Sequence, residues 1–217
     1  MKAKQRINYI SDYLDKMFPQ ANIALIHDNA YTLLVAVVLS AQCTDKRVNE
    51  VTSRLFQQAS TPSAMVRLGV SAIESIIYSC GLSSKKSRAI VNLSEILIDK
   101  YASKVPSELD MLKELPGVGH KTASVMQAHC FGIPAFPVDT HVHRLAQMWE
   151  LSNGKNVRQT EKDLKLHFPK HEWYRLHLRF ILYGRNFCKA RGCNGLRCQI
   201  CKISFPNRLI PFKARKA

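Results

Sequence analysis

Apolar residues recur at helical spacing along most of the chain, whereas we find no convincing segment with the strict alternation of a half-buried strand. Near the amino terminus, for example, Ile7, Ile10, Leu14 and Phe18 fall on one face of a helix. The pattern therefore predicts an all-α fold, ending in a cysteine-rich loop and a basic tail. The other predicted helices lie at the apolar run 31–41, after the caps Thr44, Thr61 and Ser71, and over residues 84–101, 107–115, 119–131, 139–151, 157–168 and 171–187.

A stiff turn, "LPGVGHKTASV" (residues 115–125), separates two of these helices. Pro116 fixes one backbone angle, while Gly117 and Gly119 permit conformations and close approaches that other residues do not. The helix that follows begins with unpaired N–H groups and a partial positive charge, so a phosphate could bind there without any sequence being read. The alternative is a glycine-rich turn that only joins two packed helices.

A lysine and an aspartate stand at the starts of two successive predicted helices. Lys121 lies in the first turn of one helix, where the helix dipole disfavours a cation, so a partly neutral amine could attack a sugar carbon and form a Schiff base. Asp139 precedes the next helix and could accept a proton or stabilise positive charge on a sugar. The alternatives are a solvated lysine that touches phosphate and an aspartate that only caps its helix.

The charge of the chain favours a polyanionic partner. Its 217 residues carry a formal net charge of +16, spread along the whole length and not confined to one tail. Nucleic acid is the first candidate partner and an acidic membrane surface the second. No stretch is long and apolar enough to cross a bilayer, and the amino terminus resembles an amphipathic helix more than a signal peptide. We therefore expect a cytoplasmic protein.

Four cysteines crowd into fourteen residues near the carboxyl end, with the spacing C-x4-C-x4-C-x2-C. In a cytoplasmic protein such a group indicates a metal site, because disulfides are rare there. Four thiolates suit either structural zinc or a [4Fe–4S] cluster, and the spacing alone does not choose. The loop also carries Lys189 and Arg191, which we expect to contact phosphate. The four candidate metal ligands are Cys188, Cys193, Cys198 and Cys201.

Several separated motifs together resemble the endonuclease III family of bifunctional DNA glycosylases. They are "LLVAVVLSAQCTD" (33–45), "CGLSSKKS" (80–87), "LPGVGHKTASV", "FPVDTHVHRL" (136–145) and "LYGRNFC" (182–188). The resemblance implies a two-lobed helical DNA glycosylase fold with a helix-hairpin-helix and a carboxy-terminal metal-cluster loop. Residues 23–134 would form a helical barrel domain. Residues 1–22 and 135–217 would form the iron–sulfur cluster domain.

The resemblance also implies a reaction. Lys121 would attack C1′ of a damaged pyrimidine nucleotide that is flipped out of the duplex, and Asp139 would assist. The base would leave, and β-elimination from the Schiff base would cut the strand. The expected partner is double-stranded DNA with a damaged base or abasic site, bound by a monomer in the bacterial cytoplasm and nucleoid. The expected DNA contacts are Gln42 and Leu82, which would fill the gap, and Leu115, Gly117, Gly119 and His141.

Two departures from the family pattern stand out. His120 replaces the arginine that usually precedes the lysine, and we expect a small effect. The usual cysteine pattern, C-x6-C-x2-C-x5-C, is matched only at Cys188 and Cys198. A [4Fe–4S] cluster with re-routed loops is expected, with zinc or a labile cluster as the alternative. Leu82 could instead be a packing residue.

Two other functions stay open. One is an adenine-type glycosylase without lyase activity, a group that generally lacks the lysine and carries an extra domain for which we expect this chain to have no room. The other is a non-catalytic helix-hairpin-helix module that only binds DNA, for which Lys121 and Asp139 would be coincidental.

Overall fold

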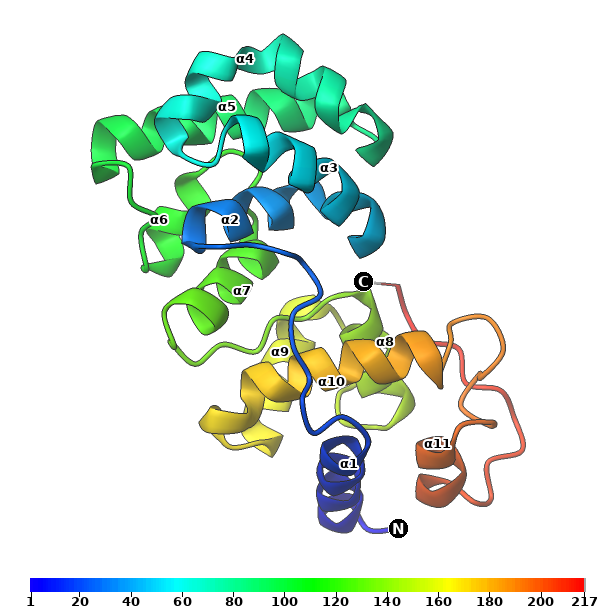
Figure 1. Ribbon diagram of the computed structural model, residues 1–217. Helices are drawn as coiled ribbons and strands as arrows, with labels where there is room; N and C mark the ends of the chain where they lie inside the picture. The colour runs from blue at the N-terminus through cyan, green and yellow to red at the C-terminus, as the bar shows by residue number, and fades with distance from the viewer. Residues whose placement is uncertain (217) are drawn as a thin grey trace. The chain divides into compact units, whose positions relative to one another are not determined.

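The computed structural model describes residues 1–216, in which all regular structure is helical, so the predicted all-α fold is confirmed (Figure 1). The predicted helices agree with the observed ones to within a few residues. The α-helices are α1 (Ala3–Met17), α2 (Ala30–Leu39), α3 (Asp45–Gln58), α4 (Pro62–Ile77), α5 (Ser83–Tyr101), α6 (Leu109–Glu114), α7 (His120–Cys130), α8 (Thr140–Met148), α9 (Val157–His167), α10 (Trp173–Asn186) and α11 (Gln199–Ser204). Two short 3₁₀ turns are η1 (Tyr78–Cys80) and η2 (Lys170–Glu172). Within residues 1–216, no helix has the length and apolarity that a membrane crossing requires.

The chain forms two compact units, and one of them is built from both ends of the sequence. The contiguous unit comprises Ala24–Ile133 and contains α2 to α7. The other combines Met1–Ile23, which contains α1, with the chain from Pro134 onward. The hairpin around Lys121 therefore belongs to the first unit, and Asp139 and the cysteines belong to the second.

Helix α2 forms the centre of the contiguous unit. Every residue from Tyr31 to Leu39 is buried, as expected for a helix that is apolar on all sides. The Asn29 side chain caps its start by accepting a hydrogen bond from the N–H of Thr32 (3.0 Å). The helix packs against α3, α5 and α7. The turns at its carboxyl end and the hairpin before α7 are thus attached to one rigid element.

Helix α4 is bent where the sequence indicated two helices. Thr61 caps its start, accepting from the N–H of Ala64 (3.2 Å), as predicted. The backbone of Gly69 (φ 79°, ψ 162°) is non-helical and divides α4 two residues before the predicted cap Ser71. Glycine adopts this positive φ without the steric cost that a side chain would impose.

The core of the second unit is aromatic. The buried rings of Trp149 and Phe180 pack edge to face with centroids 4.9 Å apart, and Tyr183 lies 5.6 Å from Trp149. Helix α10, which carries Phe180 and Tyr183, packs against both α1 and α8. The amino-terminal helix is therefore joined to the later part of the chain by core packing.

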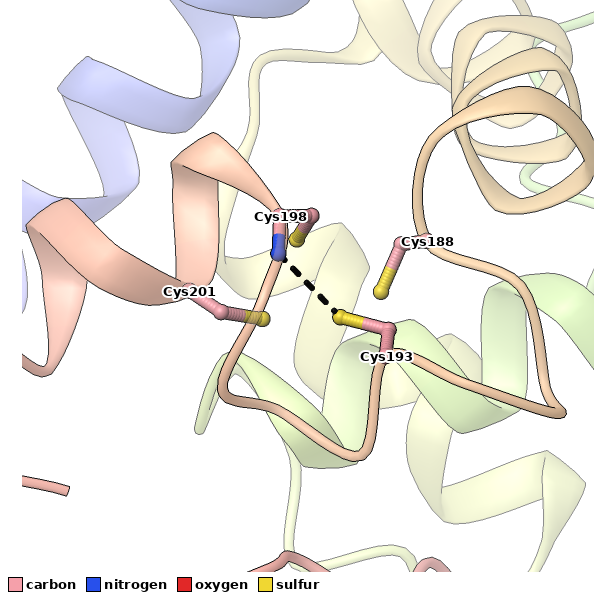
Figure 2. Close-up of side chains that lie close together, drawn as sticks. All are labelled: Cys188, Cys193, Cys198 and Cys201. Atoms are coloured by element: carbon pink, nitrogen blue, oxygen red, sulfur yellow. Dashed lines mark hydrogen bonds between the residues drawn. The ribbon is translucent and has the colours of Figure 1, made fainter. Parts of the chain in front are cut away.

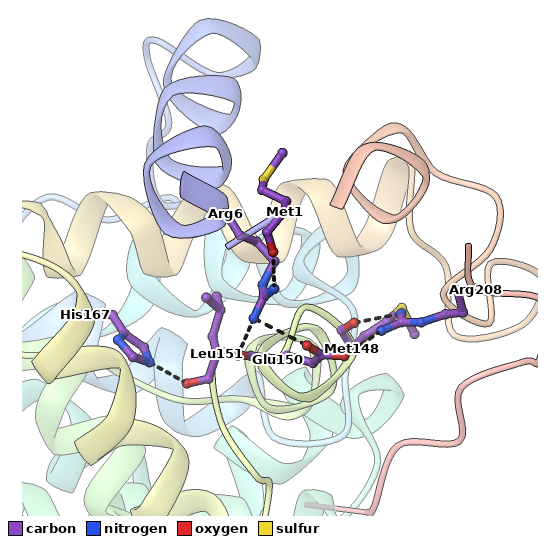
Figure 3. A network of polar contacts seen from close by, with 7 residues as sticks. All are labelled: Met1, Arg6, Met148, Glu150, Leu151, His167 and Arg208. Carbon is purple, nitrogen blue, oxygen red and sulfur yellow. Dashed lines mark hydrogen bonds and ion pairs between the residues drawn. The ribbon is translucent and has the colours of Figure 1, made fainter. Parts of the chain in front are cut away.

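A polar network around Glu150 reinforces this unit (Figure 3). The Glu150 carboxylate pairs with Arg6 of α1 and Arg208 near the carboxyl terminus, at 3.3 Å in each case. Arg208 also donates to the carbonyl of Met148 at the end of α8 (3.0 Å) and lies 3.7 Å from the Phe205 ring centroid. One carboxylate thus connects the first helix, the end of α8 and the terminal segment.

The expectation of an uninterrupted cysteine-rich loop is wrong at one point, because α11 (Gln199–Ser204) lies within it. Its buried side chains are Ile200, Cys201 and Ser204, so one metal-ligand candidate, one apolar residue and one serine set its orientation. Six residues contain less than two helical turns, which is too short for a hydrophobic period to be recognised.

Candidate functional site

The two glycines of the hairpin between α6 and α7 have different physical roles. Gly117 has a φ of +81°, and a Cβ added there would lie 3.2 Å from Cγ1 of Val38 in α2 and 3.4 Å from Cβ of Ala89 in α5. Gly117 is therefore required by its left-handed backbone and by close packing within the contiguous unit. At this position the structure supports the packing interpretation of the turn.

Gly119 instead faces open space. It is the N-cap of α7 with an extended backbone (φ −89°, ψ 178°), and a Cβ there would meet no atom within 4 Å. Gly119 supplies no side-chain cap to α7, and the start of a helix is a place where an anion is favoured. The neighbouring Leu115 side chain is buried, and any contact it makes with DNA would have to come from its backbone.

Lys121 and Asp139 both occupy helix starts. Lys121 is the second residue of α7 and is half-buried. Asp139 is the N-cap of α8, and its Oδ1 accepts a hydrogen bond from the N–H of Val142 (2.8 Å), so its predicted capping role is confirmed. That bond engages one carboxylate oxygen and leaves Oδ2 for a second partner. Capping and chemistry are therefore compatible roles for Asp139.

His141 lies two residues after Asp139 and packs against α10. A Cβ at Gly184 would lie only 3.1 Å from its Nδ1, so the absence of a side chain at Gly184 makes room for the imidazole. That Nδ1 is buried and has no hydrogen-bond partner among the described residues. Burial lowers the pKa of His141, and the nearby Arg144 adds to this, whereas Asp139 opposes it. The imidazole is thus favoured in its neutral form.

Gln42 and Leu82 share an unusual backbone. Each has a φ of 54°, a left-handed conformation that non-glycine residues seldom adopt. Both side chains are exposed, and Leu82 retains 49% of its accessible surface. Strained backbones of this kind persist only where the surroundings hold them, and they concentrate at functional sites. The two residues expected to fill a gap in DNA are thus both exposed at the tips of strained turns.

The four predicted metal ligands converge in the second unit (Figure 2). The sulfur atoms of Cys188, Cys193, Cys198 and Cys201 all lie within 4.8 Å of one another, and all four residues are buried. Cys188 follows α10, while Cys198 caps α11 and Cys201 lies within it. Cys193 and Cys201, which depart from the usual family spacing, therefore lie close to Cys188 and Cys198, which match it.

Hydrogen-bond donors point at the sulfurs. The N–H of Cys198 donates to Sγ of Cys193 (3.4 Å), and the Arg144 guanidinium donates to Sγ of Cys188 (3.9 Å) and to its carbonyl (2.7 Å). Hydrogen bonding from Cys188 lowers the pKa of Cys193 and lowers that of Cys198 to about 7, whereas the bond with Cys193 raises the pKa of Cys188, and the pKa of Cys201 is also raised. Thiolates are the form that binds metal, so buried, converging thiols with donors around them fit a metal centre.

The segment between the first two cysteines presents its cations to solvent. Lys189 and Arg191 are exposed, as is Arg197 in the following segment, and Gly192 turns the chain with a φ of 123°. The cysteines at the ends of these short segments are buried. The arrangement holds positive charges on fixed backbone, as a phosphate-binding loop requires.

Lys86 is a buried cation that the sequence patterns did not single out. It lies on the inward face of α5, and its amine donates three hydrogen bonds to backbone carbonyls. A signal for its burial was present, because residues 86, 90, 93 and 97 fall on one helical stripe whose other members are apolar.

Comparison with known proteins places this chain first in a superfamily and then in a family. Residues 35–170 match the HhH-GPD superfamily of base excision DNA repair proteins. The chain is 39% identical over 200 residues to the endonuclease III of Bacillus subtilis (strain 168), covering 92% of this chain and 91% of that protein. It therefore belongs to the endonuclease III family, and the resemblance noted in its motifs is confirmed.

Two solved structures match closely. One is a non-covalent endonuclease III–DNA complex, with a TM-score of 0.87 and 42% identity over 95% of this chain and 100% of that chain. The other is a trapped endonuclease III–DNA covalent intermediate, with a TM-score of 0.86 and 43% identity over 94% of this chain and 99% of that chain. The two-lobed glycosylase fold and DNA as the partner of this family are thereby supported.

The different roles of the hairpin glycines lead to a stability prediction. Gly117→Ala forces a side chain into a left-handed backbone against Val38, so we expect the free energy of unfolding to fall by about 1–3 kcal/mol. Gly119→Ala adds a methyl group to open space and loses only a favourable N-cap, so we expect a fall of about 1 kcal/mol or less. Urea unfolding of both variants would measure this, and equal losses would contradict the assignment.

Proposed function

We propose that this chain is a DNA repair glycosylase with AP lyase activity, which excises oxidised pyrimidines from duplex DNA and cleaves the resulting abasic strand. The observation that carries the proposal is the similarity, along almost the whole chain, to an endonuclease III trapped covalently on DNA. Within that similarity, an amine at the start of α7 and a carboxylate at the start of α8 are the groups that such chemistry needs.

In the proposed reaction, the Lys121 amine attacks C1′ of the damaged nucleotide. A bond forms between Nζ and C1′, and the bond from C1′ to the base breaks, so that the base leaves with the electron pair. Asp139 accepts a proton from the amine and stabilises positive charge on the sugar through Oδ2. The bond from C1′ to the ring oxygen O4′ then breaks, O4′ takes up a proton, and the nitrogen lone pair completes the protonated Schiff base. Loss of a proton from C2′ of this Schiff base then expels the 3′ phosphate by β-elimination.

The target nucleotide must leave the helix before it can react. We assign Gln42 and Leu82 to the space that it vacates, because both are exposed on strained turns. The N–H groups after Gly119, with Lys189 and Arg191 on the cysteine loop, are assigned to phosphates. His141, neutral and beside Asp139, is assigned to the DNA strand near the reacting sugar. Since the substrate is DNA, we place the protein in the bacterial cytoplasm, bound as a monomer to the nucleoid.

We propose that Cys188, Cys193, Cys198 and Cys201 hold a [4Fe–4S] cluster, which fixes the backbone of the cationic loop. An all-thiolate set of buried ligands supports this. One observation favours zinc instead. A tetrahedral zinc ion with bonds of about 2.3 Å holds its sulfurs roughly 3.8 Å apart, which lies within the observed 4.8 Å limit, whereas a four-iron cluster needs wider separation.

The assignment of Lys121 as nucleophile predicts the behaviour of a trapped adduct. Borohydride added during the reaction should reduce the Schiff base and leave the protein covalently attached to damaged duplex DNA. We expect this adduct to disappear in Lys121→Ala, because no other group would supply the amine. Lys113→Ala removes an exposed lysine of α6 and serves as the control. An adduct that persists in Lys121→Ala would refute the assignment.

The assignment of Asp139 predicts a loss of rate without a loss of fold. Asparagine caps helices as well as aspartate does, so Asp139→Asn should change the free energy of unfolding by less than about 0.5 kcal/mol. Excision in single-turnover assays should nevertheless fall by at least about 100-fold, since a general base is removed. DNA binding should survive, as measured by fluorescence anisotropy. A non-catalytic DNA-binding module would instead show binding with no cleavage even by the unaltered protein.

The metal centre predicts a composition that can be measured directly. A [4Fe–4S] protein is yellow-brown and contains four iron and four sulfide ions per chain. Cys198→Ala, which removes one ligand, should reduce the bound iron and the affinity for undamaged DNA as the loop relaxes. Cys130→Ala, in the other unit, provides the matched control. A colourless protein with one zinc ion per chain would contradict the [4Fe–4S] assignment and support zinc.

A further inference from the structure

Lys86 is a buried charged residue of the contiguous unit, and its ammonium group is fully hydrogen-bonded. Its residue exposure is only 5%, and its Nζ donates to the carbonyls of Leu39 (2.8 Å), Ala41 (2.7 Å) and Cys80 (3.0 Å). A lysine ammonium has three donors, and all three are used. Buried lysines are rare, so this one requires an explanation.

The three acceptors come from two separate turns. Leu39 and Ala41 are at the carboxyl end of α2, where unpaired carbonyls and the helix dipole favour a cation. Cys80 ends the 3₁₀ turn η1, which precedes α5. One ammonium group therefore joins two turns that are distant in sequence, since Leu39 and Cys80 are 41 residues apart.

Each of these turns leads directly to one of the strained, exposed residues. Gln42 follows Ala41, and Leu82 lies two residues after Cys80. The backbone N–H of Lys86 also donates to the carbonyl of Leu82 (2.9 Å), which closes the first turn of α5. The side chain of Lys86 thus bonds to Ala41, which precedes Gln42, and to Cys80, which lies two residues before Leu82. Its backbone N–H bonds to Leu82 itself.

Packing alone does not explain a charge at this position. Burial lowers the pKa of the Lys86 amine, which shows that the charged form is costly there, although the nearby Cys80 and Cys43 thiols oppose the effect. An apolar side chain of similar volume could fill the space without this cost, but it could not hold three carbonyls at fixed positions. The ammonium group, by contrast, holds the carbonyls of the two turns at fixed positions.

We propose that Lys86 is a positioning residue for base excision, which orients Gln42 and Leu82 so that both can enter the space left by the extruded nucleotide. The inference rests on the proposed function, because the two side chains have this role only if a nucleotide is extruded. Left-handed backbone is unfavourable for non-glycine residues, and the bonds from Lys86 fix carbonyls at Ala41, beside Gln42, and at Leu82 itself.

The variant Lys86→Met tests the proposal, since it keeps an unbranched side chain of similar length and removes the donors. We expect single-turnover excision from damaged duplex DNA to fall by about 10-fold or more. The matched control is Lys85→Met, the exposed neighbour in the same helix turn, which should excise at the unaltered rate. Both variants should first be shown to be folded by circular dichroism and urea unfolding.

A spectroscopic readout separates positioning from general damage. In a Lys121→Ala background, saturating protein is added to a duplex with an abasic site opposite 2-aminopurine, whose fluorescence reports unstacking. Insertion of Gln42 and Leu82 should raise the fluorescence with Lys85→Met, and the rise should be lost with Lys86→Met. Should Lys86→Met fail to fold, Lys86→Gln, which retains an amide donor, takes its place and should give an intermediate loss.

A double-mutant cycle completes the test. If Lys86 acts through Gln42 and Leu82, Lys86→Met should slow excision little further in a protein that already carries Gln42→Ala and Leu82→Ala. The proposal would be overturned if Lys86→Met slowed excision by the same factor with and without Gln42→Ala and Leu82→Ala. It would also be overturned if Lys86→Met gave the same excision rate and the same fluorescence as Lys85→Met. If the unaltered protein excised no base from damaged duplex DNA, the proposed function itself would fail instead.

Discussion

The burial of α2 is the constraint on which the functional features of the contiguous unit depend. Val38 packs against Gly117, so the position of the hairpin before Lys121 is set from this helix. At its carboxyl end, the carbonyls of Leu39 and Ala41 receive the Lys86 ammonium and lead into Gln42. A helix that is apolar on every side cannot rotate without exposing apolar surface to water. The hairpin that precedes Lys121 and the strained turns are therefore both positioned against this one buried helix.

Long periodic segments and their caps could be predicted from the sequence, because local chemistry determines them. The helix expected over 84–101 is observed as α5 (Ser83–Tyr101), and Thr44, Thr61 and Asp139 cap the helices that follow them. The helix α11 was missed because six residues are too few to reveal a period. The candidate residues emerged from their spacing and the resemblance, but whether they contact DNA as assigned remains a prediction.

Other features depend on distant partners and could not be read from sequence. Gln42 and Leu82 have left-handed backbones, and nothing in their residue types indicates a positive φ. The helical stripe that contains Lys86 indicates its burial, but only the fold reveals its three carbonyl partners. Cysteine spacing identified a ligand set, whereas the separation of the sulfurs, which bears on zinc against iron, required coordinates.

The division of the chain determines the order in which its parts can form during synthesis. The contiguous unit, Ala24–Ile133, is complete once its last helix has left the ribosome, so its core can close early. The other unit needs α1, which precedes the contiguous unit, and Arg208, which follows it, to meet at Glu150. Helix α1 therefore remains without its core partner until α10 has been made. The four cysteines, which follow α10 along the chain, can therefore converge only after the contiguous unit has been made.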